Sequence, residues 1–245
     1  MSVSPQDAKL LLLSSSKAGD SAYLAPCVDA IAQHCGSRRI LFIPYAGVCM
    51  PYGDYTAKVQ HALAPAGIDV VGIESFDDPH QAVAEAQAIM VGGGNTFHLL
   101  HQLYQHELIA TIQYAVQNGT PYVGWSAGSN IAGLSIRTTN DMPIIEPPSF
   151  AALQLVPFQL NPHYTDYQPP GFHGETRDQR LGEFMAIAPQ TPVIGIPEGS
   201  ALQLENGRLT YQATAFSQNS PAYVFLDGNK QAISPGTDCS QWLSR

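Results

Sequence analysis

The chain has 245 residues, of which 44% are hydrophobic and 13% are charged, so it is long and apolar enough to bury a large core. Eleven basic residues stand against twenty acidic ones, and the net charge of −9 disfavours binding to the phosphate backbone of nucleic acids. No stretch approaches the roughly 20 apolar residues of a membrane-spanning helix, so we expect no membrane partner either. The simplest organisation is a single α/β domain over residues 1–245.

The N-terminal segment and the cysteines both indicate a cytoplasmic protein. The first apolar run, Leu10–Leu13, is four residues long and lacks the basic start and cleavage site of a signal peptide, so we interpret it as the first strand. The four cysteines lack C-x-x-C spacing and have no histidine partner at metal-ligand spacing. We therefore expect reduced thiols and no bound metal.

Short apolar runs then alternate with amphipathic segments along most of the chain. The runs predicted as strands are 10–14, 40–44, 69–73, 89–91, 122–124 and 193–196. The segments predicted as helices are 24–34, 55–63, 97–103, 108–117 and 178–188. This alternation indicates an α/β fold with a mostly parallel sheet and helices on both faces.

Two regions depart from the alternation. Residues 138–170 are rich in proline and lack helical periodicity, so we predict an irregular excursion over the C-terminal ends of the strands, where such folds bind ligands. After residue 198, short strands surround the turns Asn206-Gly207 and Asp227-Gly228, which predicts antiparallel hairpins at the edge of the sheet.

The sequence Gly124-Trp125-Ser126-Ala127-Gly128 has the pattern G-x-S-x-G directly after a predicted strand. This pattern is typical of a sharp strand-to-helix turn that presents a serine nucleophile. Both glycines are needed because a Cβ at either place would collide with the neighbouring backbone. Taken alone, the five residues fit a nucleophile and an ordinary loop equally well.

A second glycine run, at 92–94, follows the predicted strand 89–91. It lacks the lysine of a Walker motif and the G-x-G-x-x-G spacing, which disfavours a nucleotide site. A serine that attacks a carbonyl needs backbone N–H donors for the oxyanion that forms. We expect Ala127, next to the serine, and Gly94, at the end of the neighbouring run, to supply them.

A serine nucleophile also needs a base and an acid that orients the base. His163 lies inside the excursion predicted over the strand ends, and His173 is the alternative base. For the acid, Glu198 follows the predicted strand 193–196, and Asp141 lies fifteen residues after the serine. The chemistry of these residues does not choose between the two acids.

Several motifs together carry a family resemblance that runs nearly end to end. They are FIPYAGV at 42–48, VGGGNTF at 91–97, GWSAG at 124–128, IRTTNDMP at 136–143, NPH at 161–163, GETR at 174–177 and PEG at 197–199. In this order and spacing the chain resembles peptidase E, the α-aspartyl dipeptidase family of serine peptidases. The resemblance implies a flavodoxin-like sheet similar to that of class I glutamine amidotransferases.

The resemblance also implies roles for single residues. Ser126 would be the nucleophile, His163 the base, and Gly94 and Ala127 the oxyanion donors. The family has been interpreted with either acid as the third member, and we favour Glu198 over Asp141.

The implied substrate is a small peptide with an N-terminal aspartate, cleaved without metal or cofactor by a monomer or homodimer. Arg177 matches the family's specificity arginine, and a guanidinium can hold a carboxylate with two hydrogen bonds. Asn95 is a further expected substrate contact. The alternatives are a cyanophycinase-like hydrolase of β-aspartyl links and a catalytically silent ligand-binding relative.

Overall fold

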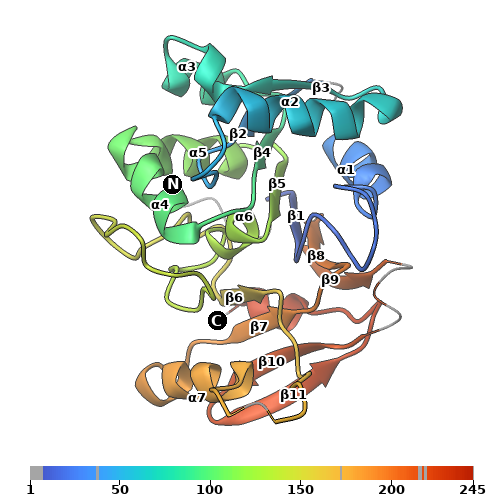
Figure 1. The fold of residues 1–245 in the computed structure, drawn as a ribbon, viewed down its shortest axis with the longest axis vertical. Helices are drawn as coiled ribbons and strands as arrows, with labels where there is room; N and C mark the ends of the chain where they lie inside the picture. Colours follow the sequence, from blue (N-terminus) through green and yellow to red (C-terminus); the bar gives the residue numbers. More distant parts are fainter. Residues whose placement is uncertain (1–7, 37–38, 172, 215–216, 218–219, 245) are drawn as a thin grey trace.

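The computed structural model describes residues 8–36, 39–171, 173–214, 217 and 220–244. Both ends of the predicted domain, residues 1–7 and 245, lie outside this part of the chain. The described residues form one sheet of seven strands and a second sheet of four. In Figure 1 the larger sheet, with its helices, occupies the upper part of the view and the smaller sheet the lower part.

The larger sheet contains β1 (Leu10–Leu13), β2 (Arg39–Ile43), β3 (Asp69–Gly72), β4 (Ile89–Val91), β5 (Tyr122–Trp125), β8 (Ser200–Glu205) and β9 (Arg208–Ala213). Its order is β3-β2-β4-β5-β1-β8-β9, with the first five strands parallel and the last two forming an antiparallel hairpin. Strands β2 to β5 thus follow the 2-1-3-4 order of a flavodoxin-like sheet, and β1 takes the place of the fifth strand.

Helices cover both faces of this sheet, which confirms the predicted fold class. They are α1 (Val28–Cys35), α2 (Tyr52–Leu63), α3 (Pro79–Ala84), α4 (Thr96–Gln105), α5 (Leu108–Gln117) and α6 (Ala127–Asn130), with 3₁₀ turns η2 (Ala64–Ala66) and η3 (Ile73–Ser75). Leu10 and Leu12 pack in the core formed with α4 and α5, whereas Leu11 and Leu13 pack in the core formed with α1 and α2. Because side chains alternate along a strand, a run of four leucines is what a strand buried on both faces requires.

The smaller sheet contains β6 (Gln159–Pro162), β7 (Val193–Ile196), β10 (Ala222–Leu226) and β11 (Asn229–Ile233), in the order β11-β10-β7-β6. Helix α7 (Arg177–Ile187) packs on it through Leu181 and Met185, and the 3₁₀ turn η4 (Ser240–Ser244) follows. Two expectations therefore need correction. The run at 193–196 joins this second sheet, and the excursion at 138–170 contains a strand, β6. A short buried apolar run does not reveal which sheet it joins, since pairing is decided by distant strands.

Ser14 ties the two sheets together where β1 ends. Its buried hydroxyl donates to the carbonyl of Ile196 (2.8 Å), at the end of β7, and accepts from the backbone N–H of His163 (2.9 Å), just after β6. Its own N–H donates to the carbonyl of Ser200 (2.9 Å). One side chain thus fixes the ends of three strands relative to one another.

Across the described ranges, no helix has the length and apolar character needed to span a membrane.

Replacing Ser14 by alanine tests this tie. The change leaves a half-buried N–H and a buried carbonyl without their partner, so we expect a loss of about 1–3 kcal/mol in the free energy of unfolding, measured by urea denaturation. Ser75→Ala is the control because it removes a hydroxyl-to-carbonyl bond (2.7 Å, to Gly72) at an exposed turn. Equal stability changes in the two variants would contradict the proposed tie.

Candidate active site

Ser126 occupies a strained turn between β5 and α6. Its backbone has φ 53° and ψ −114°, outside the regions that residues with a Cβ normally adopt. Hydrogen bonds hold the turn on both sides, from Ser126 N–H to the carbonyl of Leu13 (3.2 Å) and from Asn130 N–H to the carbonyl of Ser126 (2.9 Å). Strain of this kind persists where the surroundings enforce it, and it is typical of functional sites.

Two glycines allow this turn, as the sequence pattern predicts. A Cβ on Gly124 would lie 2.3 Å from the carbonyl oxygen of Gly128, and a Cβ on Gly128 would lie 2.2 Å from that of Val91. The start of α6 therefore packs directly against the backbone of β4 and β5. The serine is presented at this point because the two strands and the helix meet without side chains between them.

His163 lies between Ser126 and Glu198. Its Nε2 is 2.8 Å from the Ser126 hydroxyl oxygen, and its Nδ1 is 2.8 Å from Oε1 of Glu198. An ionised carboxylate only accepts hydrogen bonds, so Nδ1 carries the ring hydrogen and Nε2 is free to accept from the serine. Ser126 directly follows β5, His163 directly follows β6, and Glu198 lies in the turn between β7 and β8, so the group is assembled across both sheets.

Asp141, the other candidate acid, lies elsewhere. Its Oδ2 accepts from the backbone N–H (2.7 Å) and the hydroxyl (2.5 Å) of Thr96, the first residue of α4. Aspartate is favourable there because the first N–H groups of a helix have no partner within the helix. His163 Nδ1 donates to Glu198 and not to Asp141, whose contacts are with the start of α4.

The group is open to solvent. The side chains of His163 and Glu198 are 38% and 57% exposed, and both line a cavity of about 460 Å³ together with Thr165 and Pro197. His173, the alternative base, is exposed in the segment before α7. A ligand in this cavity can therefore contact His163 and Glu198.

The two expected oxyanion donors are Gly94, in the glycine run, and Ala127, directly after the serine. The glycine run passes beside it, since a Cβ on Gly93 would lie 2.9 Å from Cβ of Ser126. Gly94 has φ 144°, and a Cβ there would lie 2.2 Å from the carbonyl of Ala46, so glycine is required. Ala127 is the first residue of α6, where a backbone N–H has no partner inside the helix.

Asn95 has structural contacts at both ends of its amide. Its Oδ1 accepts from the N–H of His98 (3.0 Å) and caps α4, while its Nδ2 donates to the carbonyl of Met142 (2.8 Å). Together with the bonds of Asp141 to Thr96, this contact fastens the loop at 139–142 to the start of α4. The expected contact with substrate therefore has to coexist with this fastening role.

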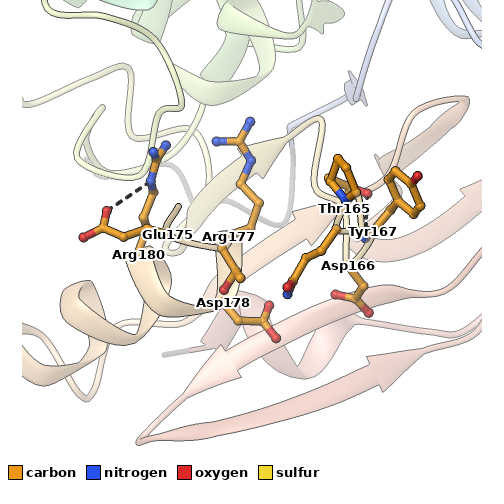
Figure 2. A pocket seen from close by; sticks show the side chains of 10 residues that line it. Thr165, Asp166, Tyr167, Glu175, Arg177, Asp178 and Arg180 are labelled. Carbon is orange, nitrogen blue, oxygen red and sulfur yellow. Dashed lines mark hydrogen bonds and ion pairs between the residues drawn. The ribbon is translucent and has the colours of Figure 1, made fainter. Parts of the chain in front are cut away.

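Arg177 is the first residue of α7, after a capping box formed by Thr176 and Gln179. It is half-buried, and its pKa is lowered by burial and by the neighbouring Arg180, an effect that Asp141 opposes. Arg180 pairs with Glu175 (3.5 Å), whereas among the described residues no ion pair involves Arg177. Figure 2 shows both guanidinium groups on the same side of the helix, at a cavity of about 370 Å³.

Sequence reasoning missed Ser14 and Thr96, which act through hydrogen bonds to residues far along the chain. The signal available for Ser14 was the run of serines at 14–16 directly after the first strand. For Thr96, no local pattern indicated a partner 45 residues away.

Comparison with known proteins places these features in a family. The model of peptidase family S51 matches residues 10–212. A peptidase E of Shewanella baltica (strain OS195) is 54% identical over 235 residues, 95% of this chain and 96% of its own length. A peptidase E of Shewanella amazonensis is 53% identical over 239 residues, 96% of this chain and 99% of its own length.

Two crystal structures share the fold. A putative peptidase E protein from Listeria monocytogenes EGD-e has a TM-score of 0.64 at 22% identity and covers 84% of this chain and 98% of its own. A peptidase from an acI-B1 Actinobacterium has a TM-score of 0.67 at 15% identity and covers 94% and 96%, respectively. At these identities the likeness concerns the fold.

The close packing at the serine predicts that Gly124→Ala is damaging. The added Cβ must displace the backbone of α6, so we expect a loss of more than about 2 kcal/mol of stability and loss of peptidase activity. Gly182→Ala, in α7, is the matched control, because a Cβ there meets nothing within 4 Å. That variant should gain about 0.5–1 kcal/mol from helix propensity. Equal stability of the two variants, measured by thermal unfolding, would contradict the packing argument.

Proposed function

The chain belongs to peptidase family S51 and is a serine dipeptidase, and we propose that it releases aspartate from the N-terminus of dipeptides through an acyl-enzyme on Ser126. The observation that carries this proposal is the continuous line of hydrogen bonds from Ser126 through His163 to Glu198. A hydroxyl bonded to the free nitrogen of an oriented imidazole is what nucleophilic acyl transfer requires.

Acylation begins when the Ser126 oxygen attacks the carbonyl of the aspartyl residue and His163 Nε2 accepts the hydroxyl proton. The tetrahedral oxyanion accepts hydrogen bonds from the N–H groups of Gly94 and Ala127. His163 then passes its proton to the leaving amine as the peptide bond breaks. Glu198 keeps the proton of the imidazole on Nδ1 and stabilises the imidazolium that forms between these steps.

Deacylation repeats the same steps with water. His163 takes a proton from a water molecule that attacks the ester carbonyl, and the proton returns to the Ser126 oxygen as aspartate leaves. Every proton moves through one imidazole, so the mechanism needs no metal or cofactor.

Selectivity for aspartate comes from Arg177 in this proposal. The arginine is half-buried beside a cavity and forms no ion pair with any described residue. A substrate carboxylate can therefore supply the missing charge with two hydrogen bonds. An asparagine side chain has the same shape but lacks the charge, so it binds less well.

We also propose that the enzyme acts in the cytoplasm, as a monomer or homodimer, on free dipeptides. The four cysteines, all within the described part, are free thiols, and Cys27, Cys35 and Cys239 are buried. Burial raises the pKa of the Cys27 and Cys35 thiols to about 12, so they stay protonated and unreactive at neutral pH. Unpaired thiols are typical of a reducing compartment.

Three substitutions test the catalytic group, with kcat/KM for Asp-Leu as the measurement and a chelator present throughout. Ser126→Ala should lower it by about 10⁴-fold or more, and Glu198→Gln by about 10²- to 10⁴-fold, because the histidine loses its orienting charge. Asp141→Asn weakens the start of α4 and should cost activity less than Glu198→Gln.

The outcomes separate the alternatives sharply. Activity that survives Ser126→Ala or disappears with the chelator would contradict the mechanism. Asp141→Asn as damaging as Ser126→Ala, with an active Glu198→Gln enzyme, would instead make Asp141 the catalytic acid.

The role of Arg177 in substrate specificity is tested by comparing kcat/KM for Asp-Leu, Asn-Leu and Glu-Leu. Arg177→Ala should reduce the preference for Asp-Leu over Asn-Leu by about 10²-fold, since it removes a charge-assisted bidentate contact. Arg180→Ala is the control, because Arg180 lies one turn on and already pairs with Glu175. A preference for Asp-Leu that persists in Arg177→Ala would show that the assigned role is wrong.

A further inference from the structure

A cluster of charged and aromatic side chains joins the segment after His163 to the start of α7. Lys230, on β11, has its Nζ 2.7 Å from Oδ1 of Asp166 and 2.9 Å from Oδ2 of Asp178. Asp166 lies three residues after His163, and Asp178 directly follows Arg177. A single ammonium group therefore connects the segment of the base to the helix of the specificity arginine.

Tyr164 also lies between the two aspartates that Lys230 joins. Its hydroxyl lies within hydrogen-bonding distance of Oδ1 of both Asp166 and Asp178. Burial and these two hydrogen bonds raise the pKa of Tyr164, so the hydroxyl keeps its hydrogen. The hydroxyl has one hydrogen and can donate it to one carboxylate at a time. The positive charge between the two aspartates therefore comes from Lys230.

Aromatic rings hold the ammonium in place. Lys230 Nζ lies 4.1 Å from the ring centre of Tyr223, 5.3 Å from that of Tyr164 and 5.8 Å from that of Phe225. The faces of these rings attract a cation. The side chain of Lys230 is 28% exposed, so it is largely enclosed by its neighbours. Burial alone would lower the pKa of Lys230, but the hydrogen bonds to both aspartates raise it, so the cluster is charged at neutral pH.

The side chains of the cluster and that of Arg177 point in opposite directions. Figure 2 shows the carboxylates of Asp166 and Asp178 pointing toward the strands of the smaller sheet, while the guanidinium of Arg177 points the other way. Both aspartates line the cavity of about 370 Å³ that also contains Arg177. The residues that line this cavity come from the two segments that Lys230 joins, 165–169 and 175–180.

We propose that Lys230 is a positioning residue for substrate specificity, which sets the distance between His163 and Arg177 by bridging Asp166 and Asp178. A dipeptide must place its side-chain carboxylate on Arg177 and its scissile carbonyl at Ser126 at the same time, so this distance decides how well it binds. Without the cation, two facing carboxylates repel each other and the start of α7 moves away from the segment after His163. This inference rests on the proposed role of Arg177.

Kinetic constants for Asp-Leu and the rate of inactivation by a fluorophosphonate test the proposal. The fluorophosphonate reacts with Ser126 without using Arg177, so its rate reports on Ser126 and His163 alone. Lys230→Met should raise KM by about tenfold, because a small displacement of a binding group is costly, and should leave kcat and the inactivation rate within about threefold of the original enzyme. Lys230→Arg keeps a cation between the carboxylates and should restore KM.

Arg208→Met is the matched control. Arg208, on β9, pairs with Asp238 (3.2 Å) in an exposed position, and its loss changes the net charge by the same amount. KM for Asp-Leu should stay within about twofold of its original value in this variant, because exposed ion pairs contribute little. A tenfold increase there too would attribute the effect to overall charge and overturn the proposal.

Other outcomes are equally decisive. An unchanged KM in Lys230→Met, alongside an Arg177→Ala enzyme that has lost its preference for aspartate, overturns this inference and leaves the proposed function standing. If kcat, the inactivation rate and the melting temperature all fall in Lys230→Met, the role of Lys230 is purely structural, and this result also overturns the proposal. If Lys230→Met does not fold, Asp166→Asn replaces it, since it weakens the link on one side, and an unchanged KM in that variant overturns the proposal.

Discussion

The buried hydroxyl of Ser14 is the contact on which the site depends. The nucleophile belongs to the larger sheet, whereas the base and its acid follow strands of the smaller one. Ser14 bonds to the N–H of His163 and to the carbonyl of Ile196, two residues before Glu198. It therefore holds the base and the acid against the sheet that carries the serine. A hydroxyl that both donates and accepts is suited to this place, because one partner is a buried carbonyl, the other is a half-buried N–H, and both need a hydrogen bond.

Besides the hydrogen bonds of Ser14, close backbone packing constrains Ser126 itself, and charged side chains constrain the segments farther from it. Gly124 and Gly128 allow the backbone contacts that force Ser126 into its strained turn. His163 also has a positive φ, 56°, so the base as well as the nucleophile is held in a backbone conformation that side chains rarely adopt. The segments farther from Ser126 are held by hydrogen bonds of charged side chains. Asp141 fastens its loop to α4, and Lys230 links the segment of the base to the helix that carries Arg177.

The sequence predicts most of the larger sheet because its information is local. Periodicity alone places the helix at 108–117 and the strand at 89–91 with the observed bounds, and G-x-S-x-G marks the turn at Ser126. Local patterns do not show which sheet the strand at 193–196 joins, or which acid reaches His163, because both depend on pairing between distant segments. The contacts of Ser14 and Lys230 span 149 and 64 residues, so they become visible in the folded chain. The catalytic roles of the individual residues stay predictions.

The hydrogen bond between His163 and Glu198 is the central claim, and the proton in that bond can be observed directly. In enzyme labelled with ¹⁵N-histidine and held at low temperature, a proton on Nδ1 of His163 that is bonded to a carboxylate resonates far downfield of the amide protons. We predict that this resonance is present in the original enzyme, persists in Asp141→Asn and disappears in Glu198→Ala. A resonance that persists in Glu198→Ala and disappears in Asp141→Asn would contradict the account.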